Sequence, residues 1–290
     1  MKKLLPQLLM IAAAALWGAS FIFTKSLFIN NEAITPSIIL TGRMLIATAV
    51  TIPLLMATGN LQRIKKGDIK YFILLAFAEP FLYSICETGG VRYLSGSLAA
   101  VIVATIPLFV PFAMRLVYAE RLRFAAICGV LLSLLGVWLM SQGDGGDVSI
   151  KGILLLAAAV VVAVLYTLLL VKVVDRYNPM TITAYQNAIG LCFFAPLMLI
   201  VDHDALPLLS FSPLMIGCIA FLGIFCSTLA YMFYNVGMKR LGATAACIYT
   251  NIIPVFSLLL ALAIGQETFS WLKLAGMLIA LLGLFLSQRQ

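Results

Sequence analysis

Two carboxyl groups and a phenol recur at intervals of four residues within an otherwise apolar stretch. Glu79, Tyr83 and Glu87 share one face of the helix that this stretch predicts, because residues four apart lie about one turn apart. In apolar surroundings a carboxyl group can exchange a proton, and a carboxylate can bind the amino group of a zwitterion. This face therefore predicts a site for a small molecule, with Glu79 and Glu87 as the candidates for proton coupling.

A structural interpretation of the same carboxyls stays open. A charge in the middle of a membrane costs about 3 kcal/mol on insertion scales, so it normally faces a partner. In this interpretation Glu79 pairs with Arg43 and braces two helices, while Glu87 lies near the outer water boundary and is solvated. Lys25 lies close to the outer end of its helix and is expected to extend to the interface.

The second half of the chain offers amides and phenols in place of carboxyls. A cavity with one charged wall and one aromatic, hydrogen-bonding wall suits an amphipathic molecule, such as an amino acid or an aromatic metabolite, better than a bare ion. For each tyrosine, anchoring at the membrane interface is the alternative. The predicted substrate-binding residues are Trp17, Ser20, Arg43, Glu79, Tyr83, Tyr166, Gln186, Tyr231, Asn235, Tyr249 and Asn251.

Prolines interrupt several of the predicted helices. A proline lacks the backbone N–H and leaves a carbonyl one turn earlier without its donor, so the helix bends. Pro107 and Pro254 occupy equivalent positions in the two halves, and Pro80 and Pro111 add further breaks. In transporters such breaks line the site and let two halves rock, whereas tolerated kinks are the alternative. We predict all four prolines to be hinges.

The composition places these residues in a membrane. Of 290 residues, 63% are hydrophobic and 10% are charged, whereas about 25% charged residues is usual for a soluble domain. The long apolar runs have helical length, which favours a helix bundle over a barrel. We therefore predict an all-α integral membrane protein with ten transmembrane helices. The predicted crossings are 6–28, 35–57, 69–88, 94–118, 122–140, 150–172, 179–201, 213–236, 242–264 and 269–287.

The predicted crossings form two sets of five. Residues 90–139 align without a gap with residues 237–286. Because each copy holds an odd number of crossings, the second copy must be inverted relative to the first, as is common in alternating-access transporters. We predict five-helix repeats at 1–140 and 150–290 around a central cavity, joined by an outer loop at 141–149.

Basic residues give the predicted orientation. Counted from a cytoplasmic N-terminus, most lysines and arginines fall on the inner side, and only Arg92, Lys151 and Lys273 fall outside. The positive-inside rule then places both termini in the cytoplasm. The net charge of +8 follows from this topology and does not indicate nucleic-acid binding.

Small residues recur on one face of the outermost predicted helix in each half. Such residues let two helix backbones approach closely. We expect them to pack within a monomer, and homodimerisation through these faces is the alternative. The residues are Gly129, Ser133, Gly136, Gly276, Ala280 and Gly283.

Several short motifs occur in order along the chain. The first half holds Leu16-Trp17-Gly18-Ala19-Ser20-Phe21, Pro36, Arg43, Ala99, Pro107, Glu120, Gly129 and Gly136. The second half repeats the theme with Pro179, Gln186, Ala246, Pro254, Glu267, Gly276 and Gly283. Together they resemble the EamA-type members of the drug/metabolite transporter superfamily over almost the entire chain. The resemblance implies a ten-helix transporter of small metabolites, in which helices one to four of each half surround the cavity and the fifth packs outside.

Catalytic and metal-binding patterns are absent from the sequence. The single histidine, His203, lies between Asp202 and Asp204 in a predicted outer loop, where a solvated turn is the simplest interpretation. No His-Glu helical pair and no nucleotide-binding loop occurs. We expect no enzyme activity, no cofactor and no metal.

Together these patterns predict a secondary active transporter of the bacterial cytoplasmic (inner) membrane. It moves a small organic metabolite by alternating access, as an exporter coupled to protons. Its expected partners are this small-molecule substrate and the lipid bilayer. A multidrug or quaternary-cation exporter is the first alternative, and a membrane scaffold or sensor without transport activity is the second.

Overall fold

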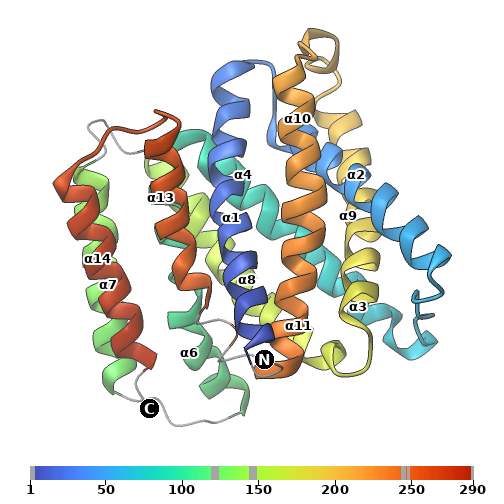
Figure 1. Cartoon of the computed structure of the whole chain (residues 1–290), viewed down its shortest axis with the longest axis horizontal. Helices are drawn as coiled ribbons and strands as arrows, with labels where there is room; N and C mark the ends of the chain where they lie inside the picture. The colour runs from blue at the N-terminus through green and yellow to red at the C-terminus, as the bar shows by residue number, and fades with distance from the viewer. Residues whose placement is uncertain (1–3, 119–123, 144–148, 243–245, 247–248, 289–290) are drawn as a thin grey trace.

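The computed structural model describes residues 4–118, 124–143, 149–242, 246 and 249–288. All regular elements in these ranges are helical (Figure 1), which confirms the predicted all-α class. The first half holds α1 (Leu5–Asn30), α2 (Pro36–Ala57), α3 (Ile69–Ala76), η2 (Phe77–Leu82), α4 (Tyr83–Tyr93), α5 (Gly96–Val103), α6 (Ile106–Tyr118) and α7 (Phe124–Gln142). The second half holds α8 (Ile150–Val174), α9 (Pro179–Val201), α10 (Pro213–Phe221), η4 (Leu222–Ala230), α11 (Tyr231–Leu241), η5 (Thr250–Ile252), α13 (Ile253–Ala263) and α14 (Trp271–Gln288).

Seven helical segments in the described ranges are long and apolar enough to cross a membrane. The segments Lys66–Tyr93 and Pro213–Leu241 each combine several of the elements above. Three shorter apolar helices, Leu131–Gln142, Thr250–Ala263 and Trp271–Gly283, lie where the fifth, ninth and tenth crossings were predicted. The multi-pass character of the chain is thus confirmed, and the total number of crossings stays a prediction.

Short polar-proline pairs determine where several helices begin. Asn178 accepts a hydrogen bond through Oδ1 from the Met180 N–H at 3.1 Å, and Pro179 follows it in the first turn. Ser212 and Pro213 do the same at the start of α10. A side-chain oxygen satisfies a free N–H of the first turn, and proline needs none there. These caps explain why the predicted start at residue 179 coincides with the observed one.

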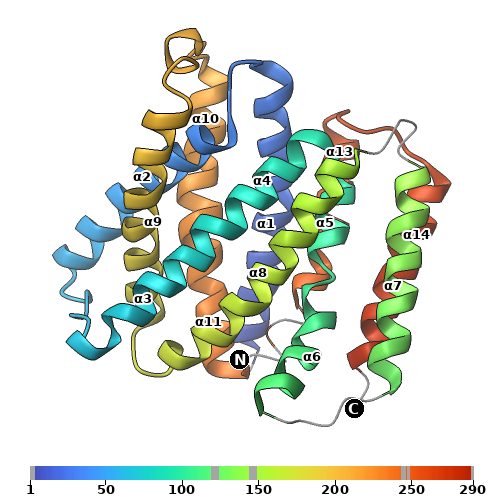
Figure 2. The ribbon, with the colours of Figure 1, turned by 180° about the vertical axis from the view of Figure 1, so that it is seen from behind.

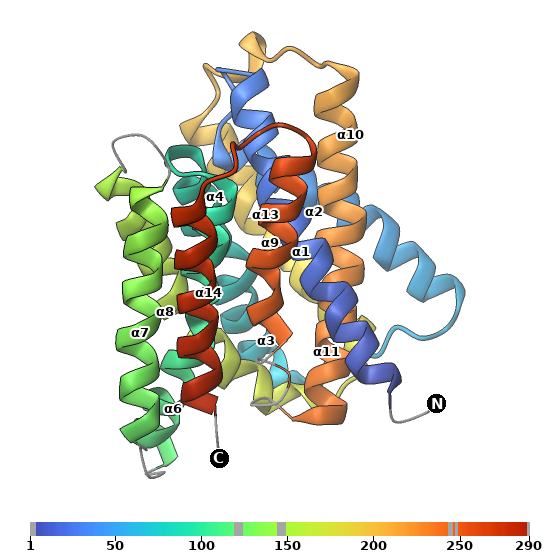
Figure 3. The same cartoon turned by 60° about the vertical axis from the view of Figure 1, so that its left-hand side comes forward.

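The first helices of the two halves run in opposite directions. α1 begins at the end of the molecule that carries the N-terminus, whereas α8 begins at the opposite end (Figures 1 and 2). α7 and α14 lie side by side at one edge (Figure 3). The other helices form the main bundle.

Glycines allow α7 and α14 to pack closely against each other. A Cβ atom on Gly136 would lie 2.4 Å from the backbone nitrogen of Ala280 and 2.5 Å from the carbonyl oxygen of Gly276. A Cβ on Gly283 would lie 2.6 Å from the carbonyl oxygen of Gly129. The two small-residue faces therefore pack against each other within one chain. Because each face is already covered, neither is left open for homodimerisation, and the oligomeric state itself stays a prediction.

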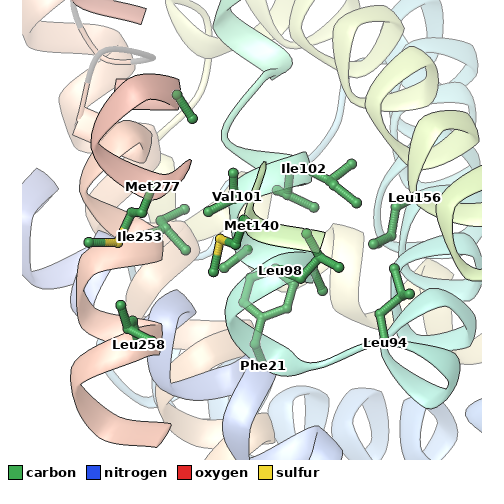
Figure 4. Close-up of a cluster of buried hydrophobic side chains, with 14 of the residues drawn as sticks. Phe21, Leu94, Leu98, Val101, Ile102, Met140, Leu156, Ile253, Leu258 and Met277 are labelled. Carbon is green, nitrogen blue, oxygen red and sulfur yellow. The ribbon is translucent and has the colours of Figure 1, made fainter. Parts of the chain in front are cut away.

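A hydrophobic cluster connects the edge pair to the main bundle (Figure 4). Phe21 of α1, Leu98 of α5 and Ile253 of α13 are each at most 3% exposed, and Met140 of α7 and Met277 of α14 pack with them. Residues from both halves therefore share one core.

Two of the four predicted hinge prolines directly follow a break between helical elements. α5 ends at Val103 and α6 starts at Ile106, so Pro107 is in the first turn of a new helix. Pro254 is likewise in the first turn of α13, after η5. In both places the proline fits the first turn after the break, where its missing N–H costs nothing. Pro80 lies in η2 and Pro111 in α6. The predicted role of all four prolines as hinges stays a prediction.

A buried ion pair closes the end of the bundle opposite the N-terminus. Lys273 Nζ lies 2.9 Å from Glu267 Oε2, and the two side chains are only 5% and 6% exposed. Glu267 also accepts hydrogen bonds from the N–H of Ser97 at 3.1 Å and from its hydroxyl at 2.5 Å. The loop before α14 is thereby attached to the start of α5, across the two halves.

Replacing Lys273 with methionine should lower the free energy of unfolding by about 3 kcal/mol, because the buried Glu267 carboxyl loses its ammonium partner. Chemical unfolding in detergent measures the change. Lys151→Met is the matched control, since Lys151 is exposed and lies 4.8 Å from the Tyr93 ring centroid. Equal stability of the two variants would show that the ion pair contributes nothing.

A second polar cluster lies at the other end of the bundle. Asp68 Oδ1 is 2.9 Å from Arg176 Nη1, and its Oδ2 accepts a hydrogen bond from the Tyr177 hydroxyl at 2.8 Å. Lys239 donates to the Tyr177 carbonyl at 3.2 Å. Burial raises the pKa of the Tyr177 phenol, so the hydroxyl keeps its proton and remains a donor. This cluster also connects the two halves, through the segments that precede α3 and α9.

Candidate functional site

A cavity of about 80 Å³ lies in the main bundle, between helices of both halves. Its wall includes α1, α2 and α4 of the first half and α8 and α11 of the second. Eight of the predicted residues line it: Trp17, Ser20, Arg43, Glu79, Tyr83, Glu87, Tyr166 and Tyr231. The structure therefore brings together residues that lie far apart in the sequence.

Glu79 lies at a break in its helix. Its φ of −142° and ψ of 119° are extended values within η2, so the predicted continuous helical face through Glu79, Tyr83 and Glu87 is wrong. The Glu79 carboxyl accepts hydrogen bonds from the Tyr231 hydroxyl and, at 3.3 Å, from the Ser84 hydroxyl. Although the break changes the direction of the main chain, the side chains of Glu79, Tyr83 and Glu87 all still line the cavity.

The other two charged groups of the cavity are also buried. Arg43 is 5% exposed and donates through Nε to the Ser227 hydroxyl at 3.2 Å. Among the described residues, no ion pair joins Arg43 to Glu79, so the bracing pair of the structural interpretation is not formed. Glu87 is 9% exposed and lines the cavity, which contradicts the same interpretation, in which it is solvated. One guanidinium and two carboxyl groups thus face a common space.

Lys25 contacts the end of a neighbouring helix. Its ammonium group donates to the carbonyl oxygens of Val91 and Arg92, both at 3.2 Å. These carbonyls belong to the last turn of α4, where the helix dipole favours a cation. The side chain therefore binds the exposed end of α4, and its predicted extension to the interface stays a prediction.

Aromatic rings form one wall of the cavity. The Trp17 ring on α1 lies 5.1 Å from the Tyr231 ring and 5.2 Å from the Tyr234 ring on α11, measured between centroids. The Trp17 indole N–H donates to the Cys226 carbonyl at 3.3 Å. Tyr234 lines the cavity together with Tyr231, three residues before it on the same helix, which agrees with the aromatic wall expected from the second half. Ser84 and Thr167 also line the cavity, but no pattern in the sequence marks these two residues as part of a site.

Four of the predicted substrate-binding residues do not line this cavity. Gln186 donates to the main-chain oxygen of Glu79 at 2.9 Å, and Asn235 donates to the Thr183 hydroxyl at 3.0 Å. Tyr249 packs with Tyr166, Tyr234 and their apolar neighbours, and Asn251 is buried in η5. Their polarity indicated a binding role, but the side chains of Gln186, Asn235 and Tyr249 contact neighbouring helices instead.

The described residues hold no group of three or more His, Cys, Asp or Glu side chains that could bind a metal ion. His203 lies on the surface, with Nε2 3.2 Å from Asp204 Oδ1. Asp202 accepts a hydrogen bond from the Ser37 hydroxyl. In this loop the acidic residues therefore serve surface contacts.

Comparison with known proteins relates the whole chain to membrane transporters. The model of the EamA-like transporter family matches residues 4–142 and again residues 150–288. The uncharacterized transporter YetK of Bacillus subtilis is 25% identical, over 95% of this chain and 84% of its own. An uncharacterized transporter of Archaeoglobus fulgidus is 26% identical, over 94% of this chain and 95% of its own.

A solved crystal structure shows the same fold. It is 19% identical, covers 95% of this chain and 97% of its own, and superposes with a TM-score of 0.68. The family model matches each half once, as the sequence duplication requires. The chain therefore belongs to the EamA-like transporter family, within the drug/metabolite transporter superfamily, and is a multi-pass membrane transporter.

Proposed function

We propose that this protein is a secondary active transporter that moves a small amphipathic metabolite, such as an amino acid, by alternating access. The observation that carries this proposal is the chemistry of the central cavity. Arg43 offers a partner for a carboxylate, Glu79 and Glu87 offer partners for an ammonium group, and Trp17 and Tyr231 cover an apolar side chain. A zwitterion with an apolar or aromatic side chain can bind the guanidinium, the carboxyl groups and the aromatic rings at the same time.

The size of the cavity supports a mechanism with more than one state. Its volume of about 80 Å³ is below the roughly 300 Å³ at which ligand pockets begin, so the site must widen to admit a metabolite. Polar clusters connect the halves at both ends, around Glu267 and around Asp68. In alternating access, the contacts within one cluster then break while the contacts within the other cluster remain.

The proposed topology has ten crossings in two inverted five-helix repeats, 1–140 and 150–290, connected by residues 141–149. The opposite directions of α1 and α8 support it. Both termini lie in the cytoplasm of a bacterial cell, because most basic residues are then on the inner side. The transporter acts as a monomer in the bilayer and exports its substrate in exchange for protons, which Glu79 or Glu87 carries.

A quaternary-cation exporter is the alternative that one observation favours. The rings of Trp17, Tyr231 and Tyr234 lie close together beside Glu79, and aromatic faces attract cations. Arg43 opposes this alternative, because its permanent positive charge lines the same cavity. A zwitterion uses the guanidinium, whereas a bare cation is repelled by it.

Flux into proteoliposomes tests the proposal. The purified protein is reconstituted and offered amino acids, aromatic metabolites and quaternary ammonium compounds, each with and without a pH gradient. We expect saturable flux of at least one zwitterion, increased by the gradient, and none into liposomes without protein. Flux of quaternary cations alone would favour the alternative, and no flux of any compound would favour a scaffold or sensor.

A further inference from the structure

The third long helix of each half contains an irregular segment. In the span Lys66–Tyr93 this segment is η2, which is broken at Glu79, and in the span Pro213–Leu241 it is η4, which is π-helical. Each segment is followed directly by an α-helix of 11 residues, α4 or α11. The two irregular segments therefore occupy corresponding positions in the two halves. π-helical insertions inside α-helices occur frequently at functional sites.

A polar side chain from the opposite half binds each irregular segment. Gln186 of α9 donates through Nε2 to the main-chain oxygen of Glu79 in η2, at 2.9 Å. Arg43 of α2 donates through Nε to the hydroxyl of Ser227 in η4, at 3.2 Å. Gln186 and Arg43 hold matching places in the sequence motifs of the two halves, each after a proline at the start of the second helix. The contacts are thus reciprocal.

Gln186 replaces a hydrogen bond that the break removes. In a regular helix the Glu79 carbonyl would accept from the N–H four residues later, but its extended φ and ψ turn it out of the helix. A buried carbonyl without a donor costs about 1–3 kcal/mol. Gln186, 3% exposed, supplies the donor from outside the central cavity. With the main chain held in this conformation, the Glu79 carboxyl meets the hydroxyls of Tyr231 and Ser84.

We propose that Gln186 is a positioning residue for Glu79, and that the contact of Arg43 with Ser227 is its counterpart in the other half. The inference rests on the proposed function in one respect, that Glu79 is the working carboxyl of the site. Gln186 is not part of the lining of the central cavity, and it contacts Glu79 through the main chain. It sets where the Glu79 carboxyl points, and it does so from the half of the molecule that must move relative to Glu79 during transport.

Carbodiimide labelling tests this role without a known substrate. Dicyclohexylcarbodiimide modifies protonated carboxyl groups in apolar surroundings, and peptide mass spectrometry measures the labelling rates of Glu79 and Glu87 in the same sample. In Gln186→Met, which keeps the length of the side chain and removes its donor, we expect the ratio of the two rates to change about fivefold, as the loss of one hydrogen bond predicts. Glu87 serves as the internal reference for global damage.

Gln266→Met is the matched control. Gln266 also donates through Nε2 to a main-chain oxygen of another helix, that of Ile22, at 3.2 Å, but it lies outside η2 and η4. A ratio within twofold of the unsubstituted protein in Gln186→Met, or an equal change in Gln266→Met, would overturn the proposal. If Gln186→Met does not fold, Gln186→Asn, with a shorter amide, takes its place. We expect Gln186→Asn to change the labelling ratio by less than fivefold but more than twofold, and a ratio equal to that of the unsubstituted protein would overturn the proposal.

Flux measurements separate this inference from the proposed function. If Glu79→Gln leaves flux unchanged while Gln186→Met changes the labelling ratio, the proposed role of Glu79 in transport is wrong and the positioning by Gln186 stands. If Glu79→Gln abolishes flux while the ratio stays constant, the function stands and the positioning is wrong.

Discussion

Proton-driven flux should fall at least about 30-fold when Glu79 is replaced by glutamine. The amide has nearly the same shape as the carboxyl and can still accept hydrogen bonds from Tyr231 and Ser84, so the fold should persist. It cannot release a proton or pair with an ammonium group. Losing one partner of a buried charge pair costs about 2 kcal/mol or more, which corresponds to this factor. Flux into proteoliposomes at several pH gradients measures it, and the remaining flux should no longer depend on the gradient.

Two further variants make this experiment decisive. Glu32→Gln removes an exposed carboxyl in the connection between α1 and α2 and should leave flux unchanged. Glu87→Gln removes the second carboxyl of the cavity. If Glu79→Gln keeps the size and the pH dependence of the flux while Glu87→Gln loses them, Glu87 is the coupling group. If both variants behave like the unsubstituted protein, neither carboxyl takes part in coupling.

A leucine at Gly136 should destabilise the protein by about 4 kcal/mol or more. The new Cβ atom would lie 2.4 Å from the Ala280 nitrogen and 2.5 Å from the Gly276 oxygen, both of which are backbone atoms that cannot rotate away. α7 and α14 would have to separate, and overpacking of this kind belongs to the most damaging substitutions. We expect the unfolding temperature in detergent to fall by about 10 °C.

Gly217→Leu is the control for this substitution. Gly217 lies in α10 on the exposed surface, and a Cβ atom there would have no neighbour within 4 Å. Leucine is also a better helix former than glycine. An unfolding temperature of Gly136→Leu equal to that of Gly217→Leu would show that α7 and α14 do not pack through their glycines.

The sequence predicts the long elements of this fold well, because their signals are local. Apolar runs of sufficient length mark the crossings, and pairs such as Asn178-Pro179 mark where a helix begins. The two small-residue faces were also recognisable, since a glycine in a membrane helix is informative by its spacing alone. The match of the two halves required only an alignment of the chain with itself.

The partners of individual side chains could not be predicted in the same way. Gln186 binds the main chain of Glu79, 107 residues away, because η2 turns that carbonyl out of its helix. No local pattern announces such a break beyond Pro80 itself. Lys25 finds the last carbonyls of α4 only because α1 and α4 are neighbours in space. Polar groups in a membrane bind whatever the tertiary structure brings within reach, and that depends on the whole fold.

The contact between α7 and α14 has a consequence for the synthesis of the protein. α7 closes the first half of the chain and α14 closes the second. Until α14 has been synthesised, the glycine face of α7 lacks the helix that covers it in the folded structure. The pairing can therefore form only after α14 has been made, and a chain truncated before Trp271 would leave Gly129 and Gly136 without this partner.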